Sequence, residues 1–435
     1  MKEKKSRSIK FNSNVIESKN NIITNTQLKT NPKKSKFIKD NKTEPNNNKL
    51  NENSNEISKL RPSKSMKEIK KIEQSLLISI EKAESIDNAK IKLAETINFR
   101  EIPDKIMDTD EFGFIKDSND IDIDKKKDNK EWLLKYNARL EKWNYMLDDY
   151  EEFEKKHFKK LKERTRKGIP DSIRGYAWQK IINVDEFYKK DIYQKLSDET
   201  TDKELEQVII KDIDRTFPKC TFFKDKYGGG QRQLYKVLVN YSKYNKEVGY
   251  VQGMGFIAAL LLTYMEEERA FFMLHALMKK RDLESLYLPG FPDLNKKLYV
   301  LLNLEKKYIT KIYNTFKKYD ILPFSYASEW FLCLFSRSLK FNSLVRIYDI
   351  FILEGYKIIY RFALAFLKSK EKEIVECTGI EIIFKVLKGC FENVDIEEII
   401  KFAFGFHISK KEIETFEKEY YKNKDNKENE FIAQL

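Results

Sequence analysis

After about residue 65, apolar residues recur every three or four positions through most of the chain, which is the spacing of an amphipathic helix. The first such stretch begins at Ser65, whose spacing to Glu68 fits a capping box, and it continues to about Ile80. A second stretch runs from Trp132 to about Arg166 and predicts one long helix with a basic end. Five further segments with this spacing are 256–265, 270–278, 327–336, 345–353 and 359–367.

This pattern predicts an all-α protein. Strands do not alternate regularly with helices, and we find no internal repeat, so one large helical domain over 166–404 is the simplest account. We expect a helical segment and linker over 65–130 and a long amphipathic helix over 131–165 to precede it. A charged helix or tail over 405–435 is expected to follow it.

Composition supports helices and sets the N-terminal tail apart. The 435 residues include 14 Gly and 9 Pro, too few for a protein of many tight turns. Residues 1–50 carry a net charge of +9 out of the total of +14 and contain ten Asn. With so few periodic apolar positions, residues 1–64 are predicted to be disordered. A basic tail on a nearly neutral body argues against a nucleic-acid partner; contact of the tail with RNA or anionic lipid ranks below simple solvation.

Several function classes lose support from missing motifs. The strongest apolar run, 256–265, is half the length of a membrane-spanning helix, and the Met1 end has no apolar signal core, so we expect a cytoplasmic protein. The four cysteines are too far apart for a CxxC pair and are expected to be reduced and mostly buried. The three histidines form no zinc motif, and 228–232 does not fit a phosphate-binding P-loop. No GxSxG, HRD or DFG motif is found either.

Two constellations remain as candidates for chemistry. Asp212 and Arg215 are three residues apart on a helical stretch, and Pro218 disfavours helix at the residue before it, so Arg215 is expected near a helix end with Asp212 helping to hold it. The alternative is an ordinary helical ion pair. In 249–255, glycines surround Gln252, whose neutral amide can both donate and accept a hydrogen bond. The alternative there is a simple helix start.

Taken with further motifs in the same order and spacing, these two constellations resemble the TBC domain, over roughly residues 166–390. The upstream segment 110–114 and the helix at Trp132 also resemble segments that often precede this domain. The motifs are Gly168-Ile169-Pro170, Arg174-Gly175 with Trp178, IxxDxxR at 209–215, Tyr250-Val251-Gln252-Gly253-Met254, and the blocks 286–291, 326–331 and 346–355.

The resemblance implies an all-helical activator of Rab-family small GTPases that inserts an arginine and a glutamine into the nucleotide site of its partner. Carried over by motif, the catalytic residues would be Arg215 and Gln252. Such a protein would be an enzyme activator with no cofactor or metal of its own, because it acts on the GTP and Mg bound to the GTPase. Supporting or GTPase-facing positions would be Asp212, Arg174, Trp178, Tyr250, Gly253 and Asp349, with Arg174, Trp178 and Asp349 interpreted first as structural.

Some positions depart from the family pattern. Gly255 stands where the family usually has Asn, Tyr348 replaces a common Trp, and 269–272 lacks the usual acidic residue and Trp. The missing amide at Gly255 raises the question of what holds the loop of Gln252.

The partner expected is a GTP-bound Rab in membrane traffic, with peripheral association with endomembranes left open. We expect activity to reside in about residues 131–424, with 1–64 dispensable. The competing hypothesis is a TBC-like helical scaffold that binds a Rab or a tether without accelerating hydrolysis. The sequence names neither the Rab nor the organelle.

Overall fold

The computed structural model describes residues 109–110, 112–115, 130–226 and 228–425. The tail predicted over 1–64 and the helix predicted from Ser65 lie outside these residues, as does nearly all of the predicted linker. Within the described part, the regular structure is helical apart from two isolated antiparallel bridges, which pair Thr109 with Ile115 and Phe114 with Cys220. The predicted all-α class is confirmed.

The single long helix predicted over 131–165 is two helices, α4 (Lys130–Asp148) and α5 (Tyr150–Arg166). Asp149 lies between them, and its side chain accepts a hydrogen bond from the backbone N of Glu152 at 3.2 Å, which caps α5. Leu147 and Tyr150 are both buried on either side of this break. The apolar spacing therefore continues across a point where the helix stops.

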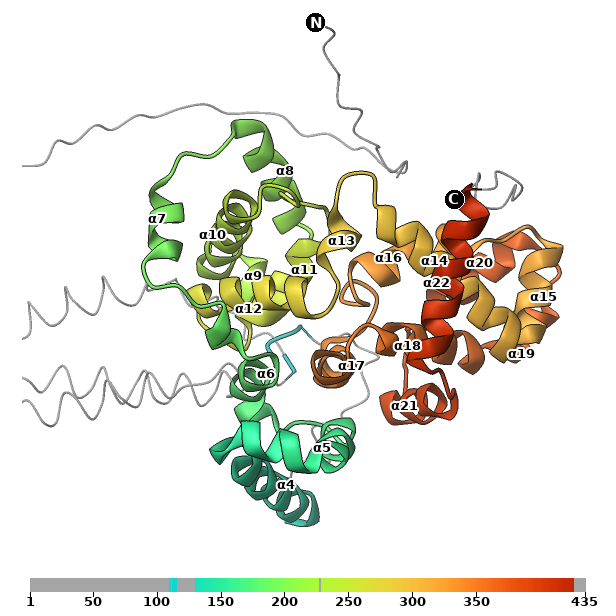
Figure 1. The fold of residues 1–435 in the computed structure, drawn as a ribbon, viewed down its shortest axis with the longest axis horizontal. Coiled ribbons are helices and arrows are strands. Elements are labelled where there is room, and N and C mark those ends of the chain that lie inside the picture. Colours follow the sequence, from blue (N-terminus) through green and yellow to red (C-terminus); the bar gives the residue numbers. More distant parts are fainter. Residues whose placement is uncertain (1–108, 111, 116–129, 227, 426–435) are drawn as a thin grey trace, which may run out of the picture. The chain divides into compact units, whose positions relative to one another are not determined.

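One group of helices surrounds α10, which packs against α7, α8, α9, α11 and α12 (Figure 1). All nine residues of α11 are buried, as expected for a helix that is apolar on every side. The bounds are η2 (Asp171–Ile173), α6 (Arg174–Ile182), η3 (Val184–Glu186), α7 (Ile192–Asp198), α8 (Lys203–Ile213), α9 (Thr221–Lys224), α10 (Gly229–Tyr244), α11 (Met254–Leu262), α12 (Glu267–Lys280) and α13 (Glu284–Tyr287).

A second group is built on α14, which packs against α15, α16, α18 and α22, while α18 also packs against α21. Helix α17 contacts α5, α6 and α18 and so joins the two groups around one continuous apolar core. The bounds are α14 (Pro292–Tyr308), α15 (Thr310–Lys318), α16 (Pro323–Leu332), α17 (Phe341–Glu354), α18 (Lys357–Ser369), α19 (Glu371–Glu376), α20 (Ile380–Gly389), α21 (Ile396–Gly405) and α22 (Lys410–Asp425).

The five short segments predicted to be helical overlap α11, α12, α16, α17 and α18. Helix α11 ends at Leu262, before residue 265, but the largest difference lies in 327–336, because α16 ends at Leu332. Leu334 and Phe335 follow with positive φ angles of 47° and 63°, and both side chains are fully buried. Packing of the Phe335 ring against Phe366, with centroids 5.4 Å apart, holds a backbone conformation that bulky residues rarely adopt.

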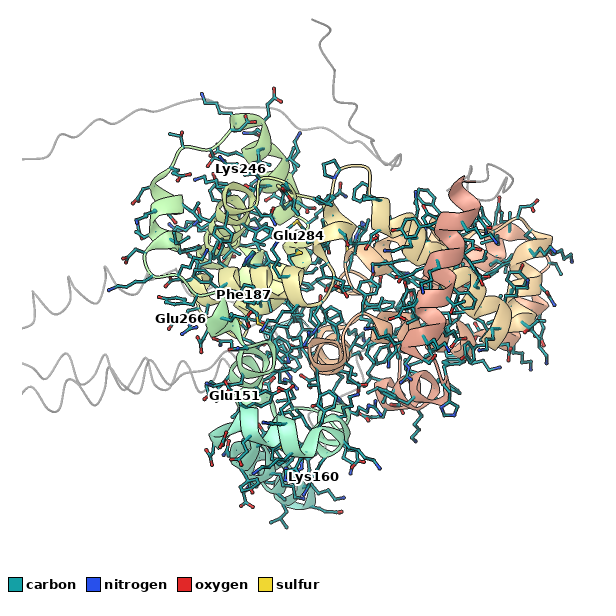
Figure 2. The ribbon with its side chains drawn as sticks, in the orientation of Figure 1. Glu151, Lys160, Phe187, Lys246, Glu266 and Glu284 are labelled. Atoms are coloured by element: carbon teal, nitrogen blue, oxygen red, sulfur yellow. The ribbon has the colours of Figure 1, made fainter. Side chains whose placement is uncertain are left out.

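Charged side chains such as Glu151, Lys160 and Lys246 are exposed, whereas the core between the helices is apolar (Figure 2). All four cysteines are free, and three of them are buried, as predicted. Among the described helices, none combines the length and apolarity needed to cross a membrane.

Helix α22 is attached to α14 by polar contacts. The side-chain amide of Asn423 donates to the hydroxyl of Tyr299 at 2.9 Å, and the Glu412 carboxylate accepts from the Tyr308 hydroxyl at 3.0 Å. Tyr420 is 3% exposed. The charged C-terminal segment is therefore helical over Lys410–Asp425 and packs on the domain.

Glu305 of α14 is a fully buried carboxyl group. The hydroxyl of Tyr326 donates to its Oε1, while Oε2 has no hydrogen-bond partner within the described residues. Burial raises its pKa from 4.5 to about 8. The folded protein therefore keeps Glu305 protonated at neutral pH, whereas the unfolded chain ionises it above about pH 4.5.

We expect Glu305→Gln to flatten the pH dependence of stability. Because the folded state holds the extra proton, the contribution of Glu305 to the free energy of unfolding is full below pH 4.5 and falls as pH rises toward 8, by up to about 1.4 kcal/mol per pH unit. The glutamine lacks this titration, so the variant should gain stability relative to the parent between pH 5.5 and 8 in urea unfolding. If the two proteins differed in free energy of unfolding by the same amount at pH 5.5 and at pH 8, the raised pKa of Glu305 would be contradicted.

Candidate functional site

Arg215 lies just beyond the C-terminal end of α8, where the sequence places it. The helix starts with Asp202 as its N-cap and ends at Ile213, and the backbone N of Arg215 donates to Asp212 O at 3.3 Å in the following turn. The Arg215 side chain is 44% exposed, whereas that of Asp212 is 2% exposed. The predicted position near a helix end is confirmed, and the guanidinium is accessible to a partner.

The buried carboxylate of Asp212 connects the turn of Arg215 to the loop of Gln252. Its Oδ1 accepts a hydrogen bond from Nε of Arg215. Its Oδ2 accepts from the hydroxyl of Tyr250 and, at 3.1 Å, from the backbone N of Gly253. One side chain therefore fixes two segments that are about forty residues apart in the sequence.

Glycines shape the loop that carries Gln252. Gly253 has a φ of 105°, and a Cβ there would lie 2.8 Å from the sulfur of Cys333, so a side chain would be both strained and crowded. Gln252 is exposed in the turn before α11, and its amide forms no hydrogen bond with other described residues. The loop therefore presents a neutral donor and acceptor to solvent.

The loop of Gln252 is held in place although position 255 is a glycine. A Cβ at Gly255 would lie 3.2 Å from Oγ1 of Thr216 and 3.7 Å from Oδ2 of Asp212, so the helix start packs closely on the turn of Arg215. Asp212 anchors the loop through Tyr250 and Gly253 without any amide at position 255.

The electrostatics of the site keep the Tyr250 hydroxyl and the Arg215 guanidinium available as hydrogen-bond donors. Burial and the neighbouring Asp212 carboxylate raise the pKa of Tyr250 well above 10, so this hydroxyl stays a donor at neutral pH. Arg215 uses Nε for Asp212, and its terminal nitrogens have no hydrogen-bond partner in the described chain. A guanidinium presents several donors in a fixed plane, so it can hold Asp212 and still bind an anion.

Phe217 is a residue of this site that the sequence motifs did not single out. It has a φ of 45° and is 7% exposed, and such a conformation in a bulky residue costs on the order of 1–3 kcal/mol. Its ring makes edge contacts with Phe114, at a centroid distance of 5.6 Å, and with Phe256, at 5.5 Å. The signal available in the sequence was that positions 112, 114, 217 and 256 are all phenylalanine.

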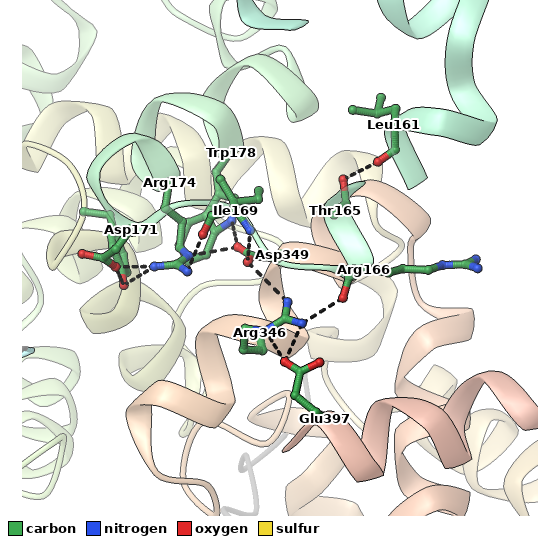
Figure 3. Close-up of polar contacts among 11 residues, drawn as sticks. Leu161, Thr165, Arg166, Ile169, Asp171, Arg174, Trp178, Arg346, Asp349 and Glu397 are labelled. Carbon is green, nitrogen blue, oxygen red and sulfur yellow. Dashed lines mark hydrogen bonds and ion pairs between the residues drawn. The ribbon is translucent and has the colours of Figure 1, made fainter. Parts of the chain in front are cut away.

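Arg174, Trp178 and Asp349 form a separate, buried cluster (Figure 3). The Asp349 carboxylate accepts hydrogen bonds from Arg174 Nε at 3.1 Å, Trp178 Nε1 at 2.9 Å and the backbone N of Ile169 at 3.0 Å. Exposure is 5% for Arg174 and 0% for the other two side chains. In this structure the cluster joins the turn before α6 to α17, and its three side chains are buried.

We expect Asp349→Ala to destabilise the protein strongly. Removing the carboxylate takes away the fully buried counter-charge of Arg174, which then keeps only the partly exposed Asp171. Two further buried donors, Trp178 Nε1 and the backbone N of Ile169, also lose their acceptor, and breaking a buried pair costs about 3–5 kcal/mol. The matched control is Asp185→Ala, because the Asp185 pair with Arg269 is exposed and such pairs contribute about 0–1 kcal/mol. Denaturant unfolding measures both; equal losses of stability would refute the structural role.

Of the predicted site residues, Arg215, Tyr250 and Gly253 bind the Asp212 carboxylate. Gln252 lies between Tyr250 and Gly253 in the same loop. The structure does not bring Arg174, Trp178 or Asp349 into hydrogen-bond contact with that carboxylate. Within the described residues, no group of His, Cys, Asp and Glu is arranged to hold a metal ion.

Comparison with protein families gives one matching domain and many relatives. The family model for the Rab-GTPase-TBC domain matches residues 171–375. The chain is 33% identical over 268 residues to the TBC1 domain family member whacked of Drosophila melanogaster, covering 60% of this chain and 74% of that protein. It is 34% identical over 282 residues to the ecotropic viral integration site 5 ortholog of the same species. That match covers 64% of this chain and 34% of the relative, so the chain spans about a third of the relative's length.

Solved structures give the same fold. The crystal structure of the Chlamydomonas flagellar RabGAP TBC domain superposes with a TM-score of 0.52 at 24% identity, covering 63% of this chain and 96% of that one. The Ypt/Rab-GAP domain of Gyp1p also superposes with a TM-score of 0.52 at 18% identity. This match covers 66% of this chain and 99% of that one. At these identities the likeness establishes the helical fold alone.

Proposed function

We propose a function from the premise that this chain belongs to the Rab-GTPase-TBC domain family. The function is activation of a Rab-family small GTPase, with this chain supplying residues in trans to the nucleotide site of its partner. The observation that carries the proposal is the Asp212 carboxylate, which holds the exposed Arg215 beside the loop of the exposed Gln252. The expected process is intracellular membrane traffic.

Arg215 would stabilise the charge that develops on phosphate oxygens during GTP hydrolysis. A guanidinium is permanently charged and planar, and its fork of donors matches phosphate oxygens. Because Nε is bound to the buried Asp212, the side chain is partly oriented before a partner arrives. Such preorganisation raises the value of a charge in a site from which water is excluded. The developing charge lies on the GTPase's nucleotide, so this chain acts as an activator.

Gln252 would orient the attacking water. This task needs a group that accepts from the water and donates to the phosphate, which a neutral amide does. The amide of Gln252 has no hydrogen-bond partner among the described residues, so nothing within this part of the chain competes for it. The loop itself is fixed through Gly253 and Tyr250, which limits the movement of the amide.

In this proposal the cofactors belong to the partner. GTP and Mg are bound by the Rab, and this chain contributes no metal or nucleotide site of its own. The partner is the GTP-bound form, because only that form holds the phosphate on which Arg215 acts. We also propose that the chain works in the cytoplasm, at the membrane surface where its Rab resides.

A panel of purified Rab proteins tests the function. Each is loaded with GTP, and phosphate release is measured with and without the full chain. We expect strong acceleration for at least one Rab. Binding to one or more Rab proteins without acceleration of any would refute the proposal and favour a scaffold that holds a Rab or a tether.

A further inference from the structure

A short segment upstream of α4 packs on the backbone that follows Arg215 and on Phe217, whose ring in turn contacts Phe256 of α11. This segment, called the clip, comprises residues 109–110 and 112–115. Its turn is closed by Asp110, whose carboxylate accepts from the backbone N of Phe112 at 2.9 Å and of Phe114 at 2.8 Å. Gly113 has a φ of 83° at the tip, where a Cβ would lie 2.9 Å from Oγ1 of Thr221.

The clip pairs with the backbone that follows Arg215. The backbone N of Thr221 donates to Gly113 O at 2.9 Å, and the backbone N of Ile115 donates to Lys219 O at 3.0 Å. Phe114 forms an antiparallel bridge with Cys220 between these two hydrogen bonds. The clip therefore fixes the chain only a few residues beyond the turn that presents the arginine.

Ring contacts extend this support to the second loop. Phe114 packs on Phe341 of α17 at 4.9 Å between centroids and makes an edge contact with Phe217 at 5.6 Å. Phe217 in turn makes an edge contact with Phe256 at 5.5 Å. Phe217 is two residues after Arg215, and Phe256 is four residues after Gln252. A continuous set of rings therefore connects the clip to both proposed catalytic segments.

We propose that the clip positions Arg215 and Gln252 for the reaction, with Phe114 as its main positioning residue; this inference rests on the proposed function. Phe217 keeps an unfavourable left-handed backbone conformation, so it depends on its packing partners. Without the Phe114 ring, the turn from Asp214 to Pro218 loses one side of its support and samples other conformations. Small displacements of catalytic groups cost rate even when the substituted residue lies away from the reacting atoms.

The inference changes one expectation from the sequence. Residues 131–424 were expected to carry the activity, but a fragment starting at Glu131 lacks the clip. Such a fragment should be a weaker activator than the full chain.

The test uses three variants of the full-length chain: Phe114→Ala, Phe114→Leu and Phe158→Ala. The last is a matched control, because Phe158 is 42% exposed on α5 and its ring contacts Lys162 of the same helix. Thermal unfolding verifies that each variant is folded. Phosphate release from an accelerated Rab is then measured against activator concentration, which separates the maximal rate from the concentration for half-maximal rate. Hydrogen exchange is followed in residues 212–222 and 250–257.

We expect Phe114→Ala to lower the maximal rate about ten- to one-hundredfold with little change in the half-maximal concentration. Exchange should rise in both segments, Phe114→Leu should recover part of both properties, and Phe158→Ala should behave like the parent. Unchanged exchange in the two segments would overturn the proposal, and so would faster exchange with an unchanged maximal rate. If Phe114→Ala does not fold, the leucine variant decides by the same two criteria. If the parent accelerates no Rab, the proposed function fails, and exchange alone decides whether the clip orders the two loops.

Discussion

Replacing Arg215 with lysine is expected to remove nearly all acceleration of GTP hydrolysis while leaving the protein folded. The expected loss in rate is about 10³-fold or more, the usual contribution of an arginine finger. In this structure Nε of Arg215 binds the buried Asp212, and the terminal nitrogens remain for a ligand. Lysine has one nitrogen for both tasks, so pairing with Asp212 would draw its charge away from the phosphate. Single-turnover phosphate release on a Rab that the parent accelerates measures the loss.

The control for this substitution is Arg269→Lys. Arg269 is 39% exposed and binds Asp185 at 2.6 Å, so it matches Arg215 in exposure and in having a carboxylate partner. Both variants should unfold at nearly the parent's temperature, because each side chain is about two-fifths exposed and lysine keeps a positive charge beside each carboxylate. Near-normal rates with both variants would exclude Arg215 as the catalytic arginine.

The second large effect is expected at Gln252. The alanine variant should lose most of its acceleration yet still bind the GTPase, because the attacking water loses its partner while the backbone of the loop stays fixed to Asp212 through Gly253. Rates of phosphate release and an equilibrium binding measurement on the same Rab separate the two effects. Loss of binding in parallel with loss of rate would make Gln252 an interface residue only.

A Rab whose own switch glutamine is changed to leucine completes this test. If Gln252 orients the water, the GTPase's glutamine is largely redundant, and this chain should still accelerate the altered Rab substantially. Activators that depend on the GTPase's own glutamine should fail on it. An inert altered Rab together with a fully active Gln252→Ala would refute the glutamine finger, even if Arg215 proved essential.

Apolar spacing was sufficient to predict several of the helices that form the core, although it did not single out α10 or α14. It predicted α11, α12, α17 and α18, because each places apolar residues on the faces that pack. It failed where apolar residues continue past a helix end. Leu147 and Tyr150 stay in phase across the cap at Asp149, and Leu334 and Phe335 are buried beyond the end of α16. Both ends depend on local backbone geometry, which a hydrophobic pattern does not encode.

The candidate site was predictable only in part. Pro218 indicated that the helix ends near Arg215, and the three-residue spacing to Asp212 indicated their pairing. The second oxygen of Asp212 binds Tyr250 and Gly253, about forty residues away, and such a contact exists only in the folded chain. The packing of Phe114 on Phe217 is equally long-range. The catalytic roles of Arg215 and Gln252 stay predictions until rates are measured.

The packing of α21 on α18 determines where a truncated recombinant form of this protein can end. The family model ends at residue 375, but Ile399, Ile400 and Ala403 of α21 are buried beyond that point. The ring of Phe404 also lies 3.9 Å from the guanidinium carbon of Arg166 at the end of α5. A piece cut at residue 375 would leave the face of α18 that meets α21 in water, and an apolar surface of this kind promotes self-association. Pieces that keep α21 and α22 should instead remain monodisperse at the concentrations that rate measurements need.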